Sequence, residues 1–179
     1  TLTLSVKVPD SVGYCRDIGL DLERWLAEGL VDFLVPGGYF QLNQWTESVA
    51  LARRHGVKVL ACLAESRVRD EKGKAERSSI ETLRARALAA WAAGVDGIEM
   101  FNHDDPTSPL WRELGDPALL RTNEALAITQ AAELMAAARA GAGPNVEIYI
   151  ECAERLSPRS AILAAQALLP YRPGWFEEP

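Results

Sequence analysis

Short apolar runs rich in β-branched residues alternate along the chain with longer segments in which apolar residues recur at helical spacing. Each run is bounded by Gly, Pro or Asp, as strands of a sheet commonly are. The pattern predicts strands at residues 2–8, 31–35, 57–64, 95–101, 146–152 and 175–177. It predicts helices at residues 22–28, 43–55, 79–93, 122–140 and 158–169. Strands and helices that alternate in this way are typical of a parallel sheet.

Small residues mark the expected helix ends. Gly56, Gly94 and Gly141 follow the second, third and fourth predicted helices, where a residue in the left-handed conformation can end a helix. Ser157-Pro158 is a favourable start for the last helix, because Ser caps and Pro fits the first turn. The residues at the expected helix ends therefore agree with the helices predicted from hydrophobic periodicity.

The alternation is compatible with a (β/α) barrel of the TIM type or with an open doubly wound sheet. No Gly-rich phosphate turn follows the first predicted strand, so we favour the barrel. A complete barrel usually takes about 250 residues, and this chain has 179. We therefore expect one barrel-type domain or fragment over residues 1–179, incomplete, with about six βα units.

Composition and charge narrow the function. The chain is 48% hydrophobic with a net charge of −6, and its longest basic run is Arg53-Arg54, which argues against nucleic-acid and acidic-membrane partners. No apolar run approaches the roughly 18 residues that would span a bilayer. The three cysteines have no paired spacing, so neither a disulfide framework nor a zinc site is indicated. These features lead us to expect a cytoplasmic protein.

Several acidic residues lie where catalytic groups of a barrel are found, at the carboxyl ends of strands. Glu65 follows the third predicted strand, Glu99 lies within the fourth, and Asp104 follows the fourth. Glycoside hydrolysis requires two carboxylates facing each other across the scissile bond. We predict these three residues as catalytic; the alternative for Glu99 is an ion pair with a cation such as Arg67.

Three other residues are candidates for substrate binding. Tyr39, in the second strand-end loop, has a ring that could stack on a sugar face, although packing is the alternative. Asn102 and His103 begin the densest polar cluster of the sequence, which could orient a ligand, hold a cation, or simply form a solvated turn and helix cap.

The first part of the chain, residues 19–120, resembles glycoside-hydrolase-like barrel families. The resemblance is carried by GLDLERWLAEGLVDFLVPGGYF (19–40), HGVKVLACL (55–63), RARALAAWAAGVDGIEMFN (84–102) and LWRELGDPALL (110–120). It implies a carbohydrate-active barrel that acts on or binds a sugar at the mouth formed by the carboxyl ends of the strands.

The last part, residues 131–179, resembles the mandelate racemase branch of the enolase superfamily. The residues that carry this are GAGPNVEIYIECAERLSPRSAILAAQALLPYRPGWFEEP (141–179), above all the Trp-Phe-Glu-Glu-Pro ending. The resemblance implies Mg²⁺ ligands at Glu177 and at Glu151, where the family usually has aspartate. Carboxylate oxygens suit Mg²⁺, although ion pairs with Lys or Arg are the alternative for such residues.

This sequence departs in two respects from the pattern of the mandelate racemase branch. The Lys-x-Lys base of the family is expected on the strand before Glu151, but residues 120–124 read Leu-Arg-Thr-Asn-Glu. Further ligands of the family follow the Glu-Glu-Pro motif and would lie after Pro179, so we expect an incomplete active site. The two resemblances meet near residues 122–135, which suggests a junction between two barrel-derived pieces.

Three functions follow from these patterns. The first is a glycoside-hydrolase-like barrel that takes a sugar. The second is a fragment of a Mg²⁺-dependent enolase-superfamily acid-sugar dehydratase. The third is a catalytically inactive partial barrel that self-associates through its open strand edges into a homo-oligomer.

Overall fold

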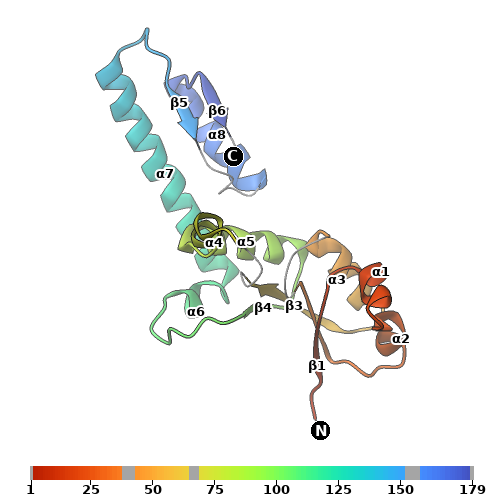
Figure 1. Ribbon diagram of the computed structural model, residues 1–179. Coiled ribbons are helices and arrows are strands. Elements are labelled where there is room, and N and C mark those ends of the chain that lie inside the picture. The colour runs from red at the N-terminus through yellow and green to blue at the C-terminus, as the bar shows by residue number, and fades with distance from the viewer. Residues whose placement is uncertain (1, 38–42, 65–68, 152–157, 178–179) are drawn as a thin grey trace. The chain divides into compact units, whose positions relative to one another are not determined.

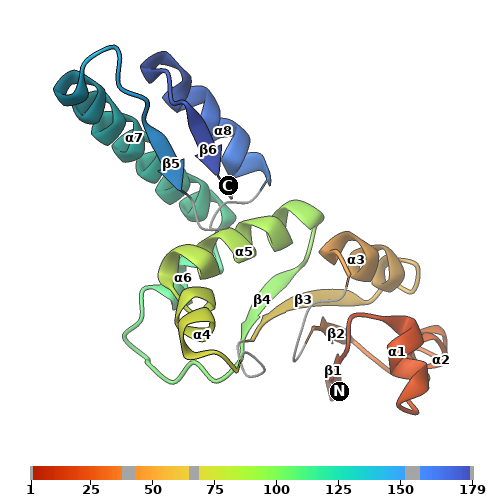
Figure 2. The same ribbon diagram turned by 45° about the horizontal axis from the view of Figure 1, so that its top comes forward.

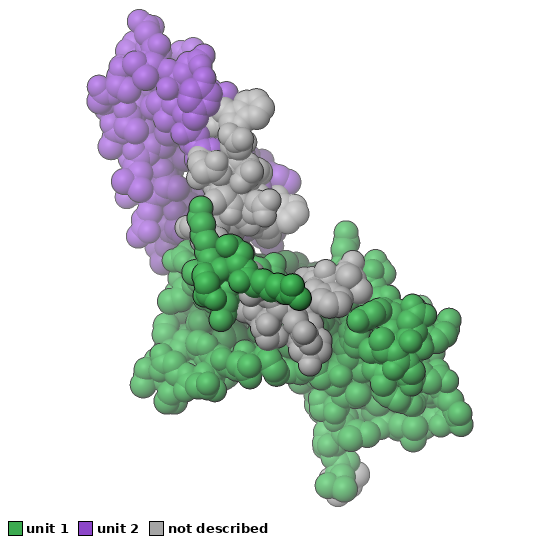
Figure 3. Space-filling view, in the orientation of Figure 1, with its two compact units in different colours: residues 1–115 green, residues 116–179 purple. Residues whose placement is uncertain are grey.

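A computed structural model describes residues 2–37, 43–64, 69–151 and 158–177. They form two compact units, Thr1–Gly115 (unit 1) and Asp116–Pro179 (unit 2) (Figure 3). Both units are built from parallel strands and helices, so the predicted α/β class with parallel strands is confirmed. The described part of the chain has a four-stranded sheet in unit 1 and a two-stranded sheet in unit 2.

Unit 1 contains a parallel sheet in the order β1-β2-β3-β4 (Figures 1 and 2). Its strands are β1 (Ser5–Val8), β2 (Phe33–Pro36), β3 (Lys58–Leu63) and β4 (Gly97–Met100). Its helices are α1 (Val12–Asp17), α2 (Leu22–Ala27), α3 (Trp45–Arg53), α4 (Glu71–Arg77), α5 (Ile80–Ala93) and α6 (Leu110–Glu113). Each strand lies within a predicted strand range or overlaps it, and the helices predicted at 22–28, 43–55 and 79–93 are present with slightly shorter bounds.

The core of unit 1 lies between the sheet and its helices. Val59, Ala61 and Leu63 alternate along β3 and are at most 2% exposed, and both α3 and α5 pack against this strand. Successive residues of a strand point to opposite faces, so the β-branched and apolar run supplies a buried row on this side. Val49 and Ala52 of α3 and Ala87 and Ala90 of α5 are also buried, so each helix contributes one apolar side to the core.

Two aspartates fix the amino ends of strands in the same way. Asp32, just before β2, accepts a hydrogen bond from the backbone N–H of Leu4 at 2.7 Å. Asp96, just before β4, accepts one from the backbone N–H of Val59 at 2.8 Å. Each carboxylate thus satisfies a donor of the neighbouring strand, which stabilises the alignment of adjacent strands.

Unit 2 contains α7 (Pro117–Ala142), β5 (Tyr149–Glu151), α8 (Pro158–Leu168), a 3₁₀ turn η1 (Leu169–Tyr171) and β6 (Trp175–Glu177). Strands β5 and β6 pair in parallel, as a βαβ unit with α8 as its crossover requires. Helix α8 packs against α7. Pro158 is the first residue of α8, as predicted, whereas Ser157 lies outside the described residues.

Two sequence predictions about α7 are wrong. The helix starts at Pro117 instead of residue 122, because the Asp116 carboxylate caps it by accepting from the N–H groups of Ala118 and Leu119. Gly141 does not end the helix but lies inside it, and the C-cap is Gly143 with φ +80°. Gly94, by contrast, is the left-handed C-cap of α5 as predicted. The expected junction at residues 122–135 falls within α7.

Candidate functional site

The best-defined polar contact of the sheet joins its two edge strands. The Lys7 ammonium of β1 donates to Glu99 Oε1 of β4 at 2.8 Å, although two strands lie between them. With a strand spacing of about 4.8 Å, three spacings would separate the two backbones by roughly 14 Å in a flat sheet. The contact therefore indicates a sheet that curves toward this side, as the wall of a barrel does.

The residues around this pair define what we call the Glu99 face of the sheet. Val35 is the register partner of Lys7, and Cys62 is the register partner of Glu99, so all four lie on one side. Val35, Cys62 and Ala64 form a buried cluster there, with Leu60 and Phe101 packed against it. Gly97 makes room in this face, because a Cβ at that position would come within 2.9 Å of Leu60 Cδ2.

The Glu99 carboxylate is held by a cation and sits beside a thiol. The ammonium of Lys7 also lies 4.3 Å from the centre of the Phe101 ring, so the cation is fixed from two sides. Burial raises the pKa of the Cys62 thiol to about 12, and the rise is increased by a hydrogen bond that the thiol donates to the Glu99 carboxylate and by the negative charge of that carboxylate. Cys62 therefore stays protonated at neutral pH and is no nucleophile. Glu99 Oε2 is buried and has no hydrogen-bond partner.

Glu99 forms an ion pair, which is the alternative to a catalytic role that the sequence suggests. The partner is Lys7; Arg67, the cation named from the sequence, lies outside the described residues. Glu65 and Tyr39 also lie outside them, so the distance from Glu99 to the predicted second carboxylate is not defined. Asp104 is exposed and forms no hydrogen bond with any residue that the structure describes. The catalytic roles of these residues stay predictions.

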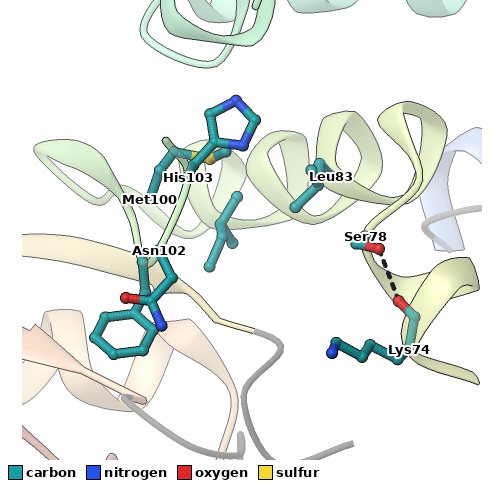
Figure 4. Close-up of a pocket in the computed structure, with 8 residues that line it drawn as sticks. Lys74, Ser78, Leu83, Met100, Asn102 and His103 are labelled. Atoms are coloured by element: carbon teal, nitrogen blue, oxygen red, sulfur yellow. Dashed lines mark hydrogen bonds between the residues drawn. The ribbon is translucent and has the colours of Figure 1, made fainter. Parts of the chain in front are cut away.

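Asn102 and His103 come together at a cavity beyond the end of β4 (Figure 4). The cavity has a volume of about 460 Å³, and its apolar wall is formed by Leu63, Leu83, Met100 and Phe101. Asn102 has φ +54°, in the left-handed region, which Asn tolerates better than other residues with a side chain. This turn at the strand end lets Met100, Asn102 and His103 all line the same cavity.

The loop that carries these residues is tied down by local contacts. The His103 ring meets the Trp111 ring edge-on with a centroid distance of 5.2 Å, and the Trp111 indole donates to the Asp105 carbonyl at 2.7 Å. Hydrogen bonds from the Thr107 hydroxyl and N–H lower the pKa of Asp105. A capped turn, the alternative considered from the sequence, is therefore present beside the cavity.

Two further residues line the cavity that were not predicted from the sequence as site residues. Lys74 and Ser78 come from α4 and the residue after it. The helix reads EKGKAER and has no apolar stripe, so hydrophobic periodicity gives no signal for it. The Ser78 hydroxyl donates to the Lys74 carbonyl of the same turn at 2.8 Å.

In unit 2, Glu151 and Glu177 are register partners on the adjacent parallel strands β5 and β6. Each is the last residue of its strand. Register partners occupy the same face of a sheet, on strands about 4.8 Å apart. The two acidic positions predicted as Mg²⁺ ligands are thus brought together by the backbone pairing. Among the described residues no group of three or more potential metal ligands is found.

The expected place of the Lys-x-Lys base was wrong. Residues 120–124 belong to α7 and not to a strand. The strand that precedes β5 is β4, which reads Gly-Ile-Glu-Met and also contains no lysine. Lys7, which contacts Glu99 of that strand, comes instead from β1.

Comparison with known protein families defines the class. Residues 82–179 match the family described as enolase C-terminal domain-like. The match runs from α5 through β4 and α7 to the end of β6, more than half of the chain. The chain therefore belongs to the enolase C-terminal domain-like family, whose fold is of the (β/α)-barrel type.

The match confirms the enolase-superfamily part of the sequence interpretation and extends it to earlier residues than expected. It covers residues 82–120, which also lie in the stretch assigned to a glycoside-hydrolase-like barrel. That second resemblance finds no support in the comparisons. A search among curated proteins gives no match. No helix among the described residues is long and apolar enough to cross a membrane.

Proposed function

We propose that the chain binds a divalent cation, Mg²⁺ by preference, through Glu151 and Glu177, and with it a carboxylate-bearing acid sugar. The observation that carries the proposal is the parallel register of the two residues at the carboxyl ends of β5 and β6. Two carboxylates on neighbouring strand ends provide the hard oxygen ligands that Mg²⁺ takes, with water and substrate oxygens completing its coordination. Membership of the enolase C-terminal domain-like family supports the assignment.

The donor set fits the metal but not the whole reaction of the mandelate racemase branch. Mg²⁺, when bound, would supply positive charge that stabilises a carboxylate losing an adjacent proton. The proton has to be taken by a base, and the Lys-x-Lys motif that the family resemblance implies is absent from β4. We therefore assign these residues to binding of the cation and the acid sugar, and not to turnover.

Thermal unfolding with and without MgCl₂ tests this proposal. A ligand that binds only the folded chain stabilises it, by about 2.7 kcal/mol at a concentration one hundred times its Kd. We expect Mg²⁺ to raise the Tm of the wild type, and gluconate to raise it further only when Mg²⁺ is present. Glu151→Gln and Glu177→Gln should each abolish the Mg²⁺ effect.

Glu133→Gln is the matched control, because Glu133 is an exposed carboxylate on α7 of the same unit. It should respond to Mg²⁺ like the wild type. A wild-type Tm that Mg²⁺ does not change would overturn the proposal, as would a Mg²⁺ effect that survives in both strand-end variants.

A second candidate function is sugar binding on the Glu99 face of unit 1. It is favoured by the buried Glu99 Oε2, which has no hydrogen-bond partner and would accept from a sugar hydroxyl. The Lys7 ammonium, 2.8 Å from Glu99 Oε1, holds the carboxylate in place for such a contact. Sugar-dependent stabilisation without metal, lost in Glu99→Gln, would support this function; stabilisation that Glu99→Gln retains would contradict it.

A further inference from the structure

The cavity beyond β4 offers a site that neither proposed function uses. Its volume of about 460 Å³ lies within the range typical of small-molecule pockets. The described residues that line the cavity all belong to unit 1 and come from the end of β3, the end of β4 and the following loop, α4 and the residue after it, and α5. Leu63, Leu83 and Met100 give it an apolar wall, which suits a hydrocarbon body better than a polyhydroxylated sugar.

The described lining residues of the cavity carry one formal positive charge. Lys74 lines it, whereas no aspartate or glutamate is found among its described lining residues. The close-up shows the Lys74 side chain reaching from α4 toward the side where Asn102 lies (Figure 4). No described carboxylate forms an ion pair with this ammonium, although the chain as a whole has a net charge of −6. A cation left unpaired beside a cavity in an acidic protein favours an anionic ligand.

Polar groups of the loop complete the arrangement. The Asn102 side-chain amide can donate to an oxyanion, and it stands across the cavity from Lys74. His103 also lines the cavity, and its ring meets the Trp111 ring edge-on. Its Nε2 is buried and has no hydrogen-bond partner, so the loop has a polar group that nothing in the described chain satisfies.

We propose that this cavity binds a small carboxylate with an apolar body. The charged end meets the Lys74 ammonium and the Asn102 amide, and the apolar body packs on Leu63, Leu83 and Met100. The ligand differs from an acid sugar in having no hydroxyl groups to satisfy, and its binding needs no metal. The inference is independent of the Glu151–Glu177 proposal.

Calorimetric titration of the full chain with benzoate, in buffer without divalent metal, tests the proposal. Benzamide is the neutral analogue of the same shape, and inorganic phosphate is the anion without an apolar body. Because a hydrogen-bonded charge contributes on the order of 1.5 kcal/mol, we expect benzoate to bind about tenfold more tightly than benzamide. Phosphate should bind more weakly than benzoate.

Lys74→Met removes the charge and keeps much of the side-chain length. Lys74 is exposed on α4, so the substitution leaves the core of the unit intact. It should reduce benzoate affinity about tenfold, to the level of benzamide. Lys72→Met removes an exposed lysine of the same helix that does not line the cavity, and it should leave benzoate binding unchanged.

Three results would overturn the inference. One is the absence of benzoate binding to the wild type. Another is equal affinity for benzoate and benzamide, which would show that the cavity does not select charge. The third is an equal loss in Lys74→Met and Lys72→Met, which would point to the general charge of α4 instead of the cavity. Failure of the Mg²⁺ experiment would leave all three measurements unaffected.

Discussion

The two units use the same βα architecture but hold it together differently. In unit 1, apolar residues of the strands β1, β2 and β3 and of the helices α1, α2, α3, α5 and α6 are buried. In unit 2, the buried apolar residues among those described are Leu120, Met135, Ala164 and Leu168, whereas Leu134 and Leu169 are more than 70% exposed. Burial of apolar surface is the dominant favourable term in folding, so unit 1 has much the larger source of stability.

One arginine of unit 2 makes a set of hydrogen bonds that joins several of its elements. The Arg139 guanidinium, near the end of α7, donates to the backbone carbonyls of Gly143, Val146, Tyr171 and Arg172. One side chain thus joins the helix end to the segment before β5 and to the turn before β6. Hydrogen bonds can therefore position a pair of short parallel strands, such as β5 and β6, where little apolar surface is buried.

The largest expected effect is on the core of unit 1. Leu34→Ala removes a side chain of β2 that is 1% exposed and should cost about 2–5 kcal/mol in the free energy of unfolding, through lost burial and the cavity left behind. Leu134→Ala on α7 is the control, because this leucine is 73% exposed and should change stability by less than about 0.5 kcal/mol. Urea unfolding measures both, and equal losses would refute the contrast between the units.

The second largest loss of stability is expected when the hydrogen bonds of Arg139 in unit 2 are removed. Arg139→Met keeps the aliphatic part of the side chain but removes all four hydrogen bonds, with an expected cost of about 2 kcal/mol. Native-state hydrogen exchange should show faster exchange in β5, β6 and the end of α7. The β1–β4 amides should exchange as in the wild type. Uniform acceleration across both units would show that they do not unfold separately.

The Lys7–Glu99 pair should have a smaller effect. Its side chains are 32% and 29% exposed, so we expect a coupling energy of about 1 kcal/mol from a double-mutant cycle with Lys7→Met and Glu99→Gln. Arg16–Glu23 is the comparison, because its side chains are 71% and 50% exposed and its coupling should be near zero. Equal coupling in the two cycles would mean that the curvature of the sheet does not shield the half-buried Lys7–Glu99 pair from solvent.

Titration of the Cys62 thiol is expected to change stability at high pH only, and to have no effect at neutral pH. In the folded chain the thiol keeps its proton up to a pKa of about 12, whereas in the unfolded chain it loses it near the ordinary value of 9.0. Between these values the unfolded state binds fewer protons, so this contribution to stability is complete below pH 9 and is lost as the pH rises toward 12. Cys62→Ala should flatten the fall in Tm across this window, and an unchanged slope would contradict the assignment.

Self-association remains a prediction from the open strand edges. Light scattering coupled to size-exclusion chromatography measures the mass in solution, and a value of twice the monomer mass of 19.6 kDa would support it. The exposed apolar side chains of unit 2, such as Leu134 and Leu169, give the dimer a surface to bury.

Most local elements and the class of fold follow from the amino-acid sequence. The β-branched run around Val59 marks a strand because alternate side chains must enter a core, and Gly94 marks a helix end because glycine adopts a positive φ without strain. The same local reasoning failed at Gly141, where another glycine two residues later ends the helix. It also failed at α4, whose charged sequence has no apolar period.

Contacts between residues far apart in the sequence depend on how the elements pack. Lys7 and Glu99 are separated by 92 positions, and their contact depends on strand order and on the curvature of the sheet. The pairing of Glu151 with Glu177 depends on the register of β5 and β6, and the approach of Lys74 to Asn102 depends on where α4 lies beside the end of β4. The hydrophobic periodicity of the sequence indicates which face of a helix or strand is buried, but it does not indicate which other element covers that face.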